Sequence, residues 1–575
     1  DNLSITVLFL VFGILGLTSC RRQAISNPGQ FYKESRVLLE SGQLPTALAS
    51  ADKGFQAFNG NNPEWAARFR VLKAEVLIWQ RRSKDALAIL QPELPADIPP
   101  DVAIRRKITQ GIANYYLRQF DASSACLQGA QTLAESTGHH EFLVDANIAK
   151  GTLALFKNDF PTARANYLEA LRGAKLLNRT FLIANATGNL GVVALRTERY
   201  DEAVDWFNQA LSYARQLNNQ TQIEKTLGNM GWCYFRMGDL DRALINFKDS
   251  EEVAARLGVV HDQLVWITNI GSVHYQRREY SQAAQYYQKA LGIARTLDNK
   301  SYAAVALQNL ASTALDTRDY DAAEKYNREA LQLAREIGDT TSELYSVEND
   351  GRIAVGRKNY ADAQKLFERV IRDSGVNITL RWESESELAE LYVEQGKDTQ
   401  ANAEFQRALA TIDKARANLS EEHRLTFLGS VDRFYEQYID FLVSHRRERD
   451  ALRVAEHGRA RTLAEGLGVA KHEAAFHPEQ TARAQRSVIL YYWLGIEHSY
   501  LWAITPTKIA LFRLPAASDL APKVQAYQKA LIGPRDVLET QNATGQELYA
   551  TLVAPAQKMI PPHSRVLIIP DGSLH

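Results

Sequence analysis

Residues 226–247 read TLGNMGWCYFRMGDLDRALINF and contain the pattern from which the fold is predicted. The first half is a helical segment that stops near Gly238, a residue that favours the end of a helix and the start of a turn. A second helix starts near Asp241 and carries Ala243 and Phe247 at the three- and four-residue steps of an amphipathic stripe. The segment therefore predicts a helical hairpin.

This hairpin recurs every 40 residues. One column holds small residues: Gly111, Gly151, Gly191, Gly231, Gly271, Ala311 and Gly351. Twelve residues later come Ser123, Ala163, Ala203, Ala243, Ala283, Ala323 and Ala363, and nine residues after the first column come Phe120, Phe160, Tyr200, Leu240, Tyr280, Tyr320 and Tyr360. Self-similarity at a fixed period is typical of stacked repeats.

The small residues predict a close approach of the two helices in each hairpin. Aromatic residues that are expected to fill the space between hairpins follow at Phe207, Phe247, Tyr287 and Phe367. The fold class is therefore mostly α, a superhelix of hairpins. Cys126 and Cys233 lie in different repeats, so we expect buried, unpaired thiols rather than a disulfide.

The small, aromatic, small, aromatic order of Gly231, Tyr234, Ala243 and Phe247 resembles the tetratricopeptide consensus. The resemblance implies a tetratricopeptide-type α-solenoid with longer helices than the plain 34-residue repeat. We expect about nine to ten units over residues 30–412, clearest over 103–375, with weaker units at Tyr32–Phe58, Trp65–Leu90 and Leu388–Leu409. HEAT-type hairpins are the alternative with a similar period.

A column of asparagines has no packing explanation: Asn189, Asn229, Asn269, Asn309 and Asn349. Asparagine is a mediocre helix former. Each one precedes the small residue by two positions, which places it about 200° round the first helix, toward the concave wall. An amide ladder can grip an extended peptide backbone. The alternative is that these amides bond neighbouring helices and face no ligand.

Two arginines, Arg196 and Arg236, follow their asparagines by seven residues on the same helix face. They are candidates for a carboxylate-binding pole of the groove, with a solvated surface role as the alternative. The partner class is a protein or extended peptide. The 67 basic residues equal the 67 acidic ones, so a nucleic-acid partner is excluded.

The amino end carries an apolar run from Leu3 to Leu17, too short to span a bilayer, and then Cys20. Leu17-Thr18-Ser19-Cys20 resembles the bacterial lipobox, which implies a signal peptide over 1–20, a linker over 21–29 and a lipid on Cys20. The expected location is the bacterial cell envelope, on the outer-membrane or periplasmic side. The alternative is an uncleaved anchor helix or a chance occurrence of Ser-Cys. Because position 1 is Asp and the last residues run off a strand pattern, we expect a fragment of a longer product.

Beyond the array, residues 413–470 predict a helical connector. It contains AEHGRARTL at 455–463, which resembles the element that joins repeats to the CHAT domain, a caspase-like module. Short strands are predicted at Val488–Trp493, Tyr500–Thr505 and Lys508–Leu514, helices at Leu520–Leu531 and Gln546–Ile560, and a buried parallel strand at Val566–Ile569. With Pro570-Asp571-Gly572, this order is similar to the opening of a CHAT domain, over 484–575.

The CHAT resemblance implies a cysteine peptidase that uses a His and a Cys. Neither position is found in this chain, so no catalytic residue is assigned, and neither a metal nor a cofactor motif is found. Two functions follow. In the first, a lipid-anchored repeat scaffold binds protein or peptide and controls a peptidase module whose catalytic half is absent here. In the second, the chain is a non-enzymatic scaffold or sensor with an inactive module.

Overall fold

The computed structural model describes residues 25, 27–95, 97–375, 377–417, 424–466, 477–532 and 543–574. The proposed signal peptide and lipid-bearing Cys20 lie outside these residues. The chain divides into two compact units: the first extends to Ala194 and includes Asp201–Met230, and the second holds Leu195–Tyr200 and everything from Gly231 onward. None of the described helices is both long enough and apolar enough to cross a membrane.

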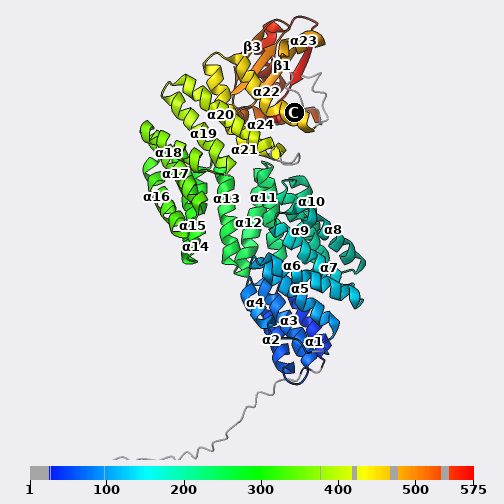
Figure 1. Cartoon of the computed structure of the whole chain (residues 1–575). Helices are drawn as coiled ribbons and strands as arrows, with labels where there is room; N and C mark the ends of the chain where they lie inside the picture. Colours follow the sequence, from blue (N-terminus) through cyan, green and yellow to red (C-terminus); the bar gives the residue numbers. More distant parts are fainter. Residues whose placement is uncertain are drawn as a thin grey trace, which may run out of the picture. The chain divides into compact units, whose positions relative to one another are not determined.

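The first unit consists of helical hairpins (Figure 1). Its helices are α1 (Pro28–Glu40), α2 (Leu44–Phe58), α3 (Pro63–Trp79), α4 (Ser83–Leu90), α5 (Pro100–Tyr116), α6 (Phe120–Ser136), α7 (Phe142–Phe156), α8 (Phe160–Leu176), most of α9 (Thr180–Arg196), most of α10 (Tyr200–Gln216) and the first part of α11 (Gln220–Arg236). The two weaker units predicted near the amino end are therefore helical hairpins, α1 with α2 and α3 with α4.

The second unit continues the hairpins (Figure 1). Its described helices up to the sheet are α12 (Leu240–Leu257), α13 (Val260–Gln276), α14 (Tyr280–Thr296), α15 (Lys300–Asp316), α16 (Tyr320–Ile337), α17 (Thr340–Gly356), α18 (Tyr360–Asp373), α19 (Ile378–Glu394), α20 (Asp398–Ala417), α21 (Arg424–Ser444), α22 (Glu448–Gly466) and α23 (Pro478–Gln485). The predicted helical solenoid is confirmed.

The small residues of the repeat lie directly against the aromatic residues sixteen positions later. A Cβ atom on Gly231 would approach the ring of Phe247 to 2.8 Å, and one on Gly351 would approach Phe367 to 2.6 Å. Both distances are shorter than real Cβ contacts, so only glycine fits without repacking. Gly238, with φ of +78°, supplies the left-handed turn between the helices.

The repeat spacing changes after α17. α19 starts 38 residues after α17, at Ile378 instead of 380, and the shift is kept along the hairpin. Ala401 and Phe405 stand 38 residues after Ala363 and Phe367, and all four are fully buried. α21 and α22 form one more hairpin, in which Ala451 follows Ala401 by 50 residues and is also buried. The segment predicted as a connector thus continues the stacking of the array.

A four-stranded sheet follows the helices, in the order β3-β2-β1-β4. Its strands are β1 (Ser487–Trp493), β2 (Ser499–Ile504), β3 (Ile509–Leu514) and β4 (Arg565–Ile569), so the four predicted strands are confirmed. β1 pairs antiparallel with β2 and parallel with β4. The prediction that β4 is buried is wrong for this chain: β4 lies at the edge of the described sheet, and Ile568 is 59% exposed.

Two helices connect β3 to β4. α24 (Ala517–Ile532) agrees with the predicted helix at Leu520–Leu531, whereas α25 (Ala543–Leu552) is shorter than predicted. A 3₁₀ helix (Ala554–Met559) continues after α25 and has Pro555 in its first turn. The ring of a proline cannot continue an α-helix from the residues before it, which explains the break.

One hydrophobic core joins the last hairpins to the sheet. It runs from Phe367 and Phe405 through Phe434 and Tyr438 of α21 to Trp502 of β2. Phe405 and Tyr438 stack with ring centroids 4.9 Å apart. The helices and the sheet of the second unit therefore share their packing, and α21 is in contact with both.

Candidate functional site

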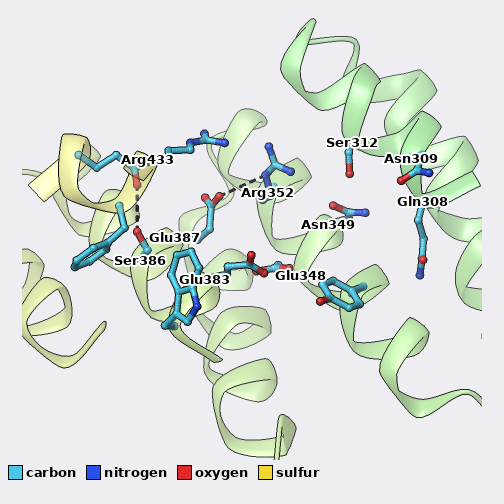
Figure 2. Close-up of a pocket in the computed structure, with 14 residues that line it drawn as sticks. Gln308, Asn309, Ser312, Glu348, Asn349, Arg352, Glu383, Ser386, Glu387 and Arg433 are labelled. Carbon is cyan, nitrogen blue, oxygen red and sulfur yellow. Dashed lines mark hydrogen bonds and ion pairs between the residues drawn. The ribbon is translucent and has the colours of Figure 1, made fainter. Parts of the chain in front are cut away.

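A pocket of about 440 Å³ lies in the second unit and is lined by four successive first helices of hairpins, α15, α17, α19 and α21. Figure 2 shows its polar side chains converging from these helices. The lining residues are Gln308, Asn309, Ser312, Tyr345, Glu348, Asn349, Arg352, Trp382, Glu383, Ser386, Glu387, Arg433, Phe434 and Gln437.

The asparagine column passes through this pocket. Asn309 and Asn349 both line it. With the spacing of 38 residues, the next position in the column is Glu387, and with the further spacing of 50 it is Gln437; both line the same pocket. Four equivalent positions on consecutive first helices therefore present polar side chains to one cavity.

The amides of the column differ in their surroundings. Asn189 and Asn229 of the first unit and Asn269 and Asn309 of the second are half-buried on their first helices. Asn349 is only 6% exposed, and its Nδ2 donates to Oδ1 of the buried Asn327, 3.4 Å away. This bond uses one of the two amide hydrogens of Asn349.

Arg352 is the charged centre of the pocket. Its Nη2 lies 3.0 Å from Oδ1 of Asp316, and its Nε lies 3.5 Å from Oε1 of Glu387. Figure 2 shows the Arg352 and Glu387 side chains directed at each other. Burial opposes the charge of Arg352, but Glu387 and Asp316 outweigh burial and raise its pKa. The hydroxyl of Tyr275 also donates to Asp316, so the arginine and its carboxylates form a fixed network.

Two further carboxylates are less well compensated. Burial, followed by the negative charge of Glu387, raises the pKa of Glu383 to about 7. Burial and the nearby Glu383 hold the pKa of Glu348 well above its ordinary value, although Oγ of Ser384 donates to its Oε1 over 3.1 Å. Among the residues whose side chains are described, none forms an ion pair or hydrogen bond with Glu383. The pocket thus holds two carboxyl groups that burial makes easy to protonate, although Arg352 and Arg433 oppose this shift for Glu383.

Aromatic side chains complete the wall. Tyr345, Trp382 and Phe434 line the pocket, and the rings of Trp382 and Phe434 meet edge to face with centroids 6.4 Å apart. Trp382 is only 5% exposed, and its indole Nε1–H has no hydrogen-bond partner within the described structure. A buried donor without a partner is uncommon in folded proteins and needs an explanation.

The two arginines predicted as a carboxylate-binding pole are not part of this pocket. Arg196 and Arg236 lie in the last turns of α9 and α11. Arg236 is 3.8 Å from Oε1 of Glu198, and its guanidinium lies over the ring of Tyr200 at 5.5 Å. The charge of Arg236 is therefore already compensated from within the second unit.

The cysteines and histidines of the described structure show no constellation for catalysis. Cys126 is half-buried and Cys233 is fully buried, both as free thiols, and burial raises the pKa of Cys233 to about 12. His457 in the AEHGRARTL element has its Nε2 2.9 Å from Asp413. Within the described ranges, His, Cys, Asp and Glu side chains nowhere gather in a group that could hold a metal ion. His575 lies outside those ranges.

A departure from the repeat pattern marks the pocket in the sequence. In the column of Phe207, Phe247 and Tyr287, the next member is Asn327 instead of an aromatic residue. Asn327 is fully buried, and its Nδ2 donates to the carbonyl of Ser346 at 2.7 Å and to Oδ1 of Asp350 at 2.6 Å. Sequence reasoning missed Asn327, the arginine network and the carboxylates. The sequence signal that could have pointed to them is a polar residue, Asn327, in a column of otherwise aromatic core residues.

Comparison with known proteins agrees with this fold. Residues 182–256 and 262–336 match the family model of the tetratricopeptide repeat, so these hairpins are tetratricopeptide repeats. The chain is similar to the apo form of RapI, with a TM-score of 0.53 and 16% identity over 61% of this chain and 99% of that one. It also resembles the apo form of the quorum sensor NprR from B. thuringiensis, with a TM-score of 0.46 and 15% identity over 60% and 97% of the two chains. No curated protein sequence matches the chain.

Proposed function

We propose that this tetratricopeptide scaffold binds an extended peptide segment of a protein partner, and that the pocket on α15, α17, α19 and α21 is the centre of the binding site in the second unit. The polar column formed by Asn309, Asn349, Glu387 and Gln437 is the observation that carries the proposal. Polar side chains at equivalent positions of consecutive stacked helices can hydrogen-bond to the backbone of an extended peptide.

Amides suit this role because each one offers a donor and an acceptor. Asn309 is half-buried, so its amide is reachable, and Gln437 accepts a 3.1 Å hydrogen bond from the Ser386 hydroxyl while its amide hydrogens remain for a ligand. We extend the proposal to Asn269 of the second unit and, within the first unit, to Asn189 and Asn229. Arg196 and Arg236 remain candidates for contacts at the margin of such a site.

The proposal includes control of the carboxy-terminal module. Arg433, Phe434 and Gln437 of α21 line the pocket. On the same helix, Oε1 of Glu436 accepts a 2.6 Å hydrogen bond from the backbone N–H of Glu497, in the segment between β1 and β2. A ligand that moves α21 would therefore also move the sheet.

What the module does is a separate part of the proposal. The order of its strands and helices along the sequence, followed by the Pro570-Asp571-Gly572 turn, resembles the start of a CHAT domain, which implies a caspase-like cysteine peptidase in the complete protein. The alternative is a non-enzymatic scaffold or sensor with an inactive module. A genomic sequence downstream of His575 that holds a His and a Cys at the ends of successive strands favours the peptidase. A continuation without them favours the scaffold.

We further propose that Cys20 carries a lipid and that the protein is held at the bacterial cell envelope, outer-membrane or periplasmic side. The support is the apolar run before the lipobox-like Leu17-Thr18-Ser19-Cys20. In that location the repeats would meet partners at the membrane surface.

Peptide binding is tested with the full chain, immobilised, and a library of random heptapeptides with acetylated and amidated ends. We expect wild type to retain peptides and the Asn309→Ala/Asn349→Ala variant to retain at least fivefold less. Asn246→Ala is the matched control, because Asn246 lies on the second helix α12 and bonds its own helix through the Arg242 carbonyl. No retention by wild type, or equal retention by wild type and the double variant, contradicts the proposed site.

A further inference from the structure

The pocket has the chemistry of a site for a positively charged group. Three carboxylates, Glu348, Glu383 and Glu387, line it against two guanidinium groups, Arg352 and Arg433. Arg352 is already held by Asp316, a fourth carboxylate, as well as by Glu387. Among the described side chains, Glu348 and Glu383 therefore have no ion pair of their own inside the pocket, although Arg352 and Arg433 act on Glu383 electrostatically.

The walls around these carboxylates are aromatic. Tyr345, Trp382 and Phe434 line the same cavity. An aromatic face attracts a cation through its quadrupole, and a carboxylate close to such faces adds charge attraction in a site that is partly shielded from water. Carboxylates and aromatic rings together favour a guanidinium or ammonium group over a neutral or acidic one.

A second, independent observation points to a peptide. Trp382 is only 5% exposed, and its indole Nε1–H has no acceptor among the described residues. A backbone carbonyl of a bound peptide is an acceptor of the right kind for this donor. Trp382 is the sequence neighbour of Glu383 on α19, and Glu387 follows on the same helix.

We propose that this pocket takes an arginine or lysine side chain of the bound peptide, with Glu383 and Glu387 facing its charge and Trp382 donating to the adjacent backbone. This inference rests on the proposed function and adds the class of residue that is recognised. Burial and the charge of Glu387 raise the pKa of Glu383 despite Arg352 and Arg433, and a basic group bound beside Glu383 would lower this pKa and favour the carboxylate. Arg433 is exposed and lines the pocket, so a basic side chain of a ligand must compete with it for the carboxylates.

The test uses the full chain and five heptapeptide libraries in which the central residue is Arg, Lys, citrulline, Gln or Glu and the other positions are random. Citrulline keeps the shape of arginine without its charge. We expect wild type to retain the Arg and Lys libraries at least fivefold more than the citrulline and Gln libraries. Glu383→Gln should bring this ratio close to one, and Arg433→Gln should raise it.

The control is Glu368→Gln, which removes an exposed carboxylate from the second helix α18 and should keep the full ratio. Retention of all five libraries to the same extent by wild type overturns the basic-residue inference and leaves peptide binding intact. An unchanged ratio in Glu383→Gln overturns it as well. If no library is retained, the proposed function falls with it. Melting curves of each variant confirm that the proteins compared are folded.

Discussion

The hydroxyl of Tyr500 in β2 donates a 2.6 Å hydrogen bond to Oδ1 of Asp440 in α21. The other oxygen of Asp440 lies 3.0 Å from Nδ1 of His498. Both contacts are long-range, from a helix of the last hairpin to the second strand of the sheet and the segment before it. They tie the sheet to a helix that also lines the pocket.

Removal of this hydroxyl should loosen the tie without unfolding the repeats. A hydrogen bond to a charged group contributes about 1.5 to 3 kcal/mol. We expect Tyr500→Phe to raise the rate of backbone hydrogen exchange over residues 494–500 by about tenfold, with α13 to α17 unchanged. Uniformly faster exchange over the second unit would contradict the local role of this contact.

The glycines of the repeat column should tolerate no larger side chain. A Cβ on Gly231 meets the buried ring of Phe247, so Gly231→Ala should destabilise the protein by about 1 to 3 kcal/mol through overpacking. Gly292, on the second helix α14, has no atom within 4 Å of an added Cβ. Gly292→Ala should stabilise by about 0.5 to 1 kcal/mol because alanine is the better helix former. Urea unfolding followed by circular dichroism compares the two.

Glu383 should make stability depend on pH in a defined direction. The folded state binds its proton with a pKa of about 7, above the ordinary 4.5 of the unfolded chain. The folded state therefore holds more protons between these values, and the stability contributed by the protonated form is lost as pH rises from about 4.5 to about 7. At pH 8 Glu383→Gln should be more stable than wild type by roughly 1 to 2 kcal/mol, allowing for its partial exposure.

The same comparison at pH 4.5 should show a much smaller difference, because the carboxyl group is then protonated in the folded wild type. Glu368→Gln, the exposed control, should follow wild type at both pH values. Urea midpoints measured at pH 4.5 and pH 8 decide the matter. A Glu383→Gln variant that is equally displaced from wild type at both pH values would show that proton binding is not the cause.

The asparagine column outside the pocket can be tested separately. The Asn229→Ala/Asn269→Ala variant changes one amide in each unit and should lose most of the retained peptide, with a melting temperature close to that of wild type. The reason is that both amides are half-buried on first helices and contribute little to the core. Unchanged peptide capture, measured with the random library, would rule out a binding role for each of these residues in its own unit.

Lipid attachment gives a yes-or-no measurement. The chain is expressed in bacteria with its own amino-terminal segment, and radiolabelled palmitate is added. We expect the label to enter wild type and not Cys20→Ser. Cys20 is the predicted site of the thioether-linked lipid. Cys126 and Cys233 lie inside repeats and are at least half-buried, so we expect neither of them to take up the label. Equal label in both proteins would refute the lipid on Cys20.

The repeats were predictable because their packing has a fixed period, and the strands because aromatic and β-branched residues cluster in short runs. The pocket was only half predictable. Asn309 and Asn349 belong to the 40-residue column, whereas Glu387 and Gln437 follow it at spacings of 38 and 50. The second helices that separate these positions differ in length, with 14 residues in α18 and 20 in α20, so equivalence across them appears only once the hairpins are stacked.

The exposure of β4 shows that an apolar run in the sequence does not by itself predict burial. Four consecutive apolar residues, Val566 to Ile569, predict burial on both sides, but a strand is buried only when neighbours cover both its faces and edges. The apolar sequence of a strand shows that it can be buried, but neighbouring strands and helices determine whether it is buried. The parallel pairing with β1, in contrast, follows from the chain direction and the connecting helices.

Seven residues separate Arg433 from Asp440 on α21, which is two helical turns or about 10 Å. Arg433 at the pocket and Asp440 at the contact with the sheet therefore lie on one continuous helix, so under the proposed function a shift of that helix at the pocket would reach the sheet directly. No relay of side chains through the repeats is required. The distance from recognition to response would be shorter than the length of the peptide recognised.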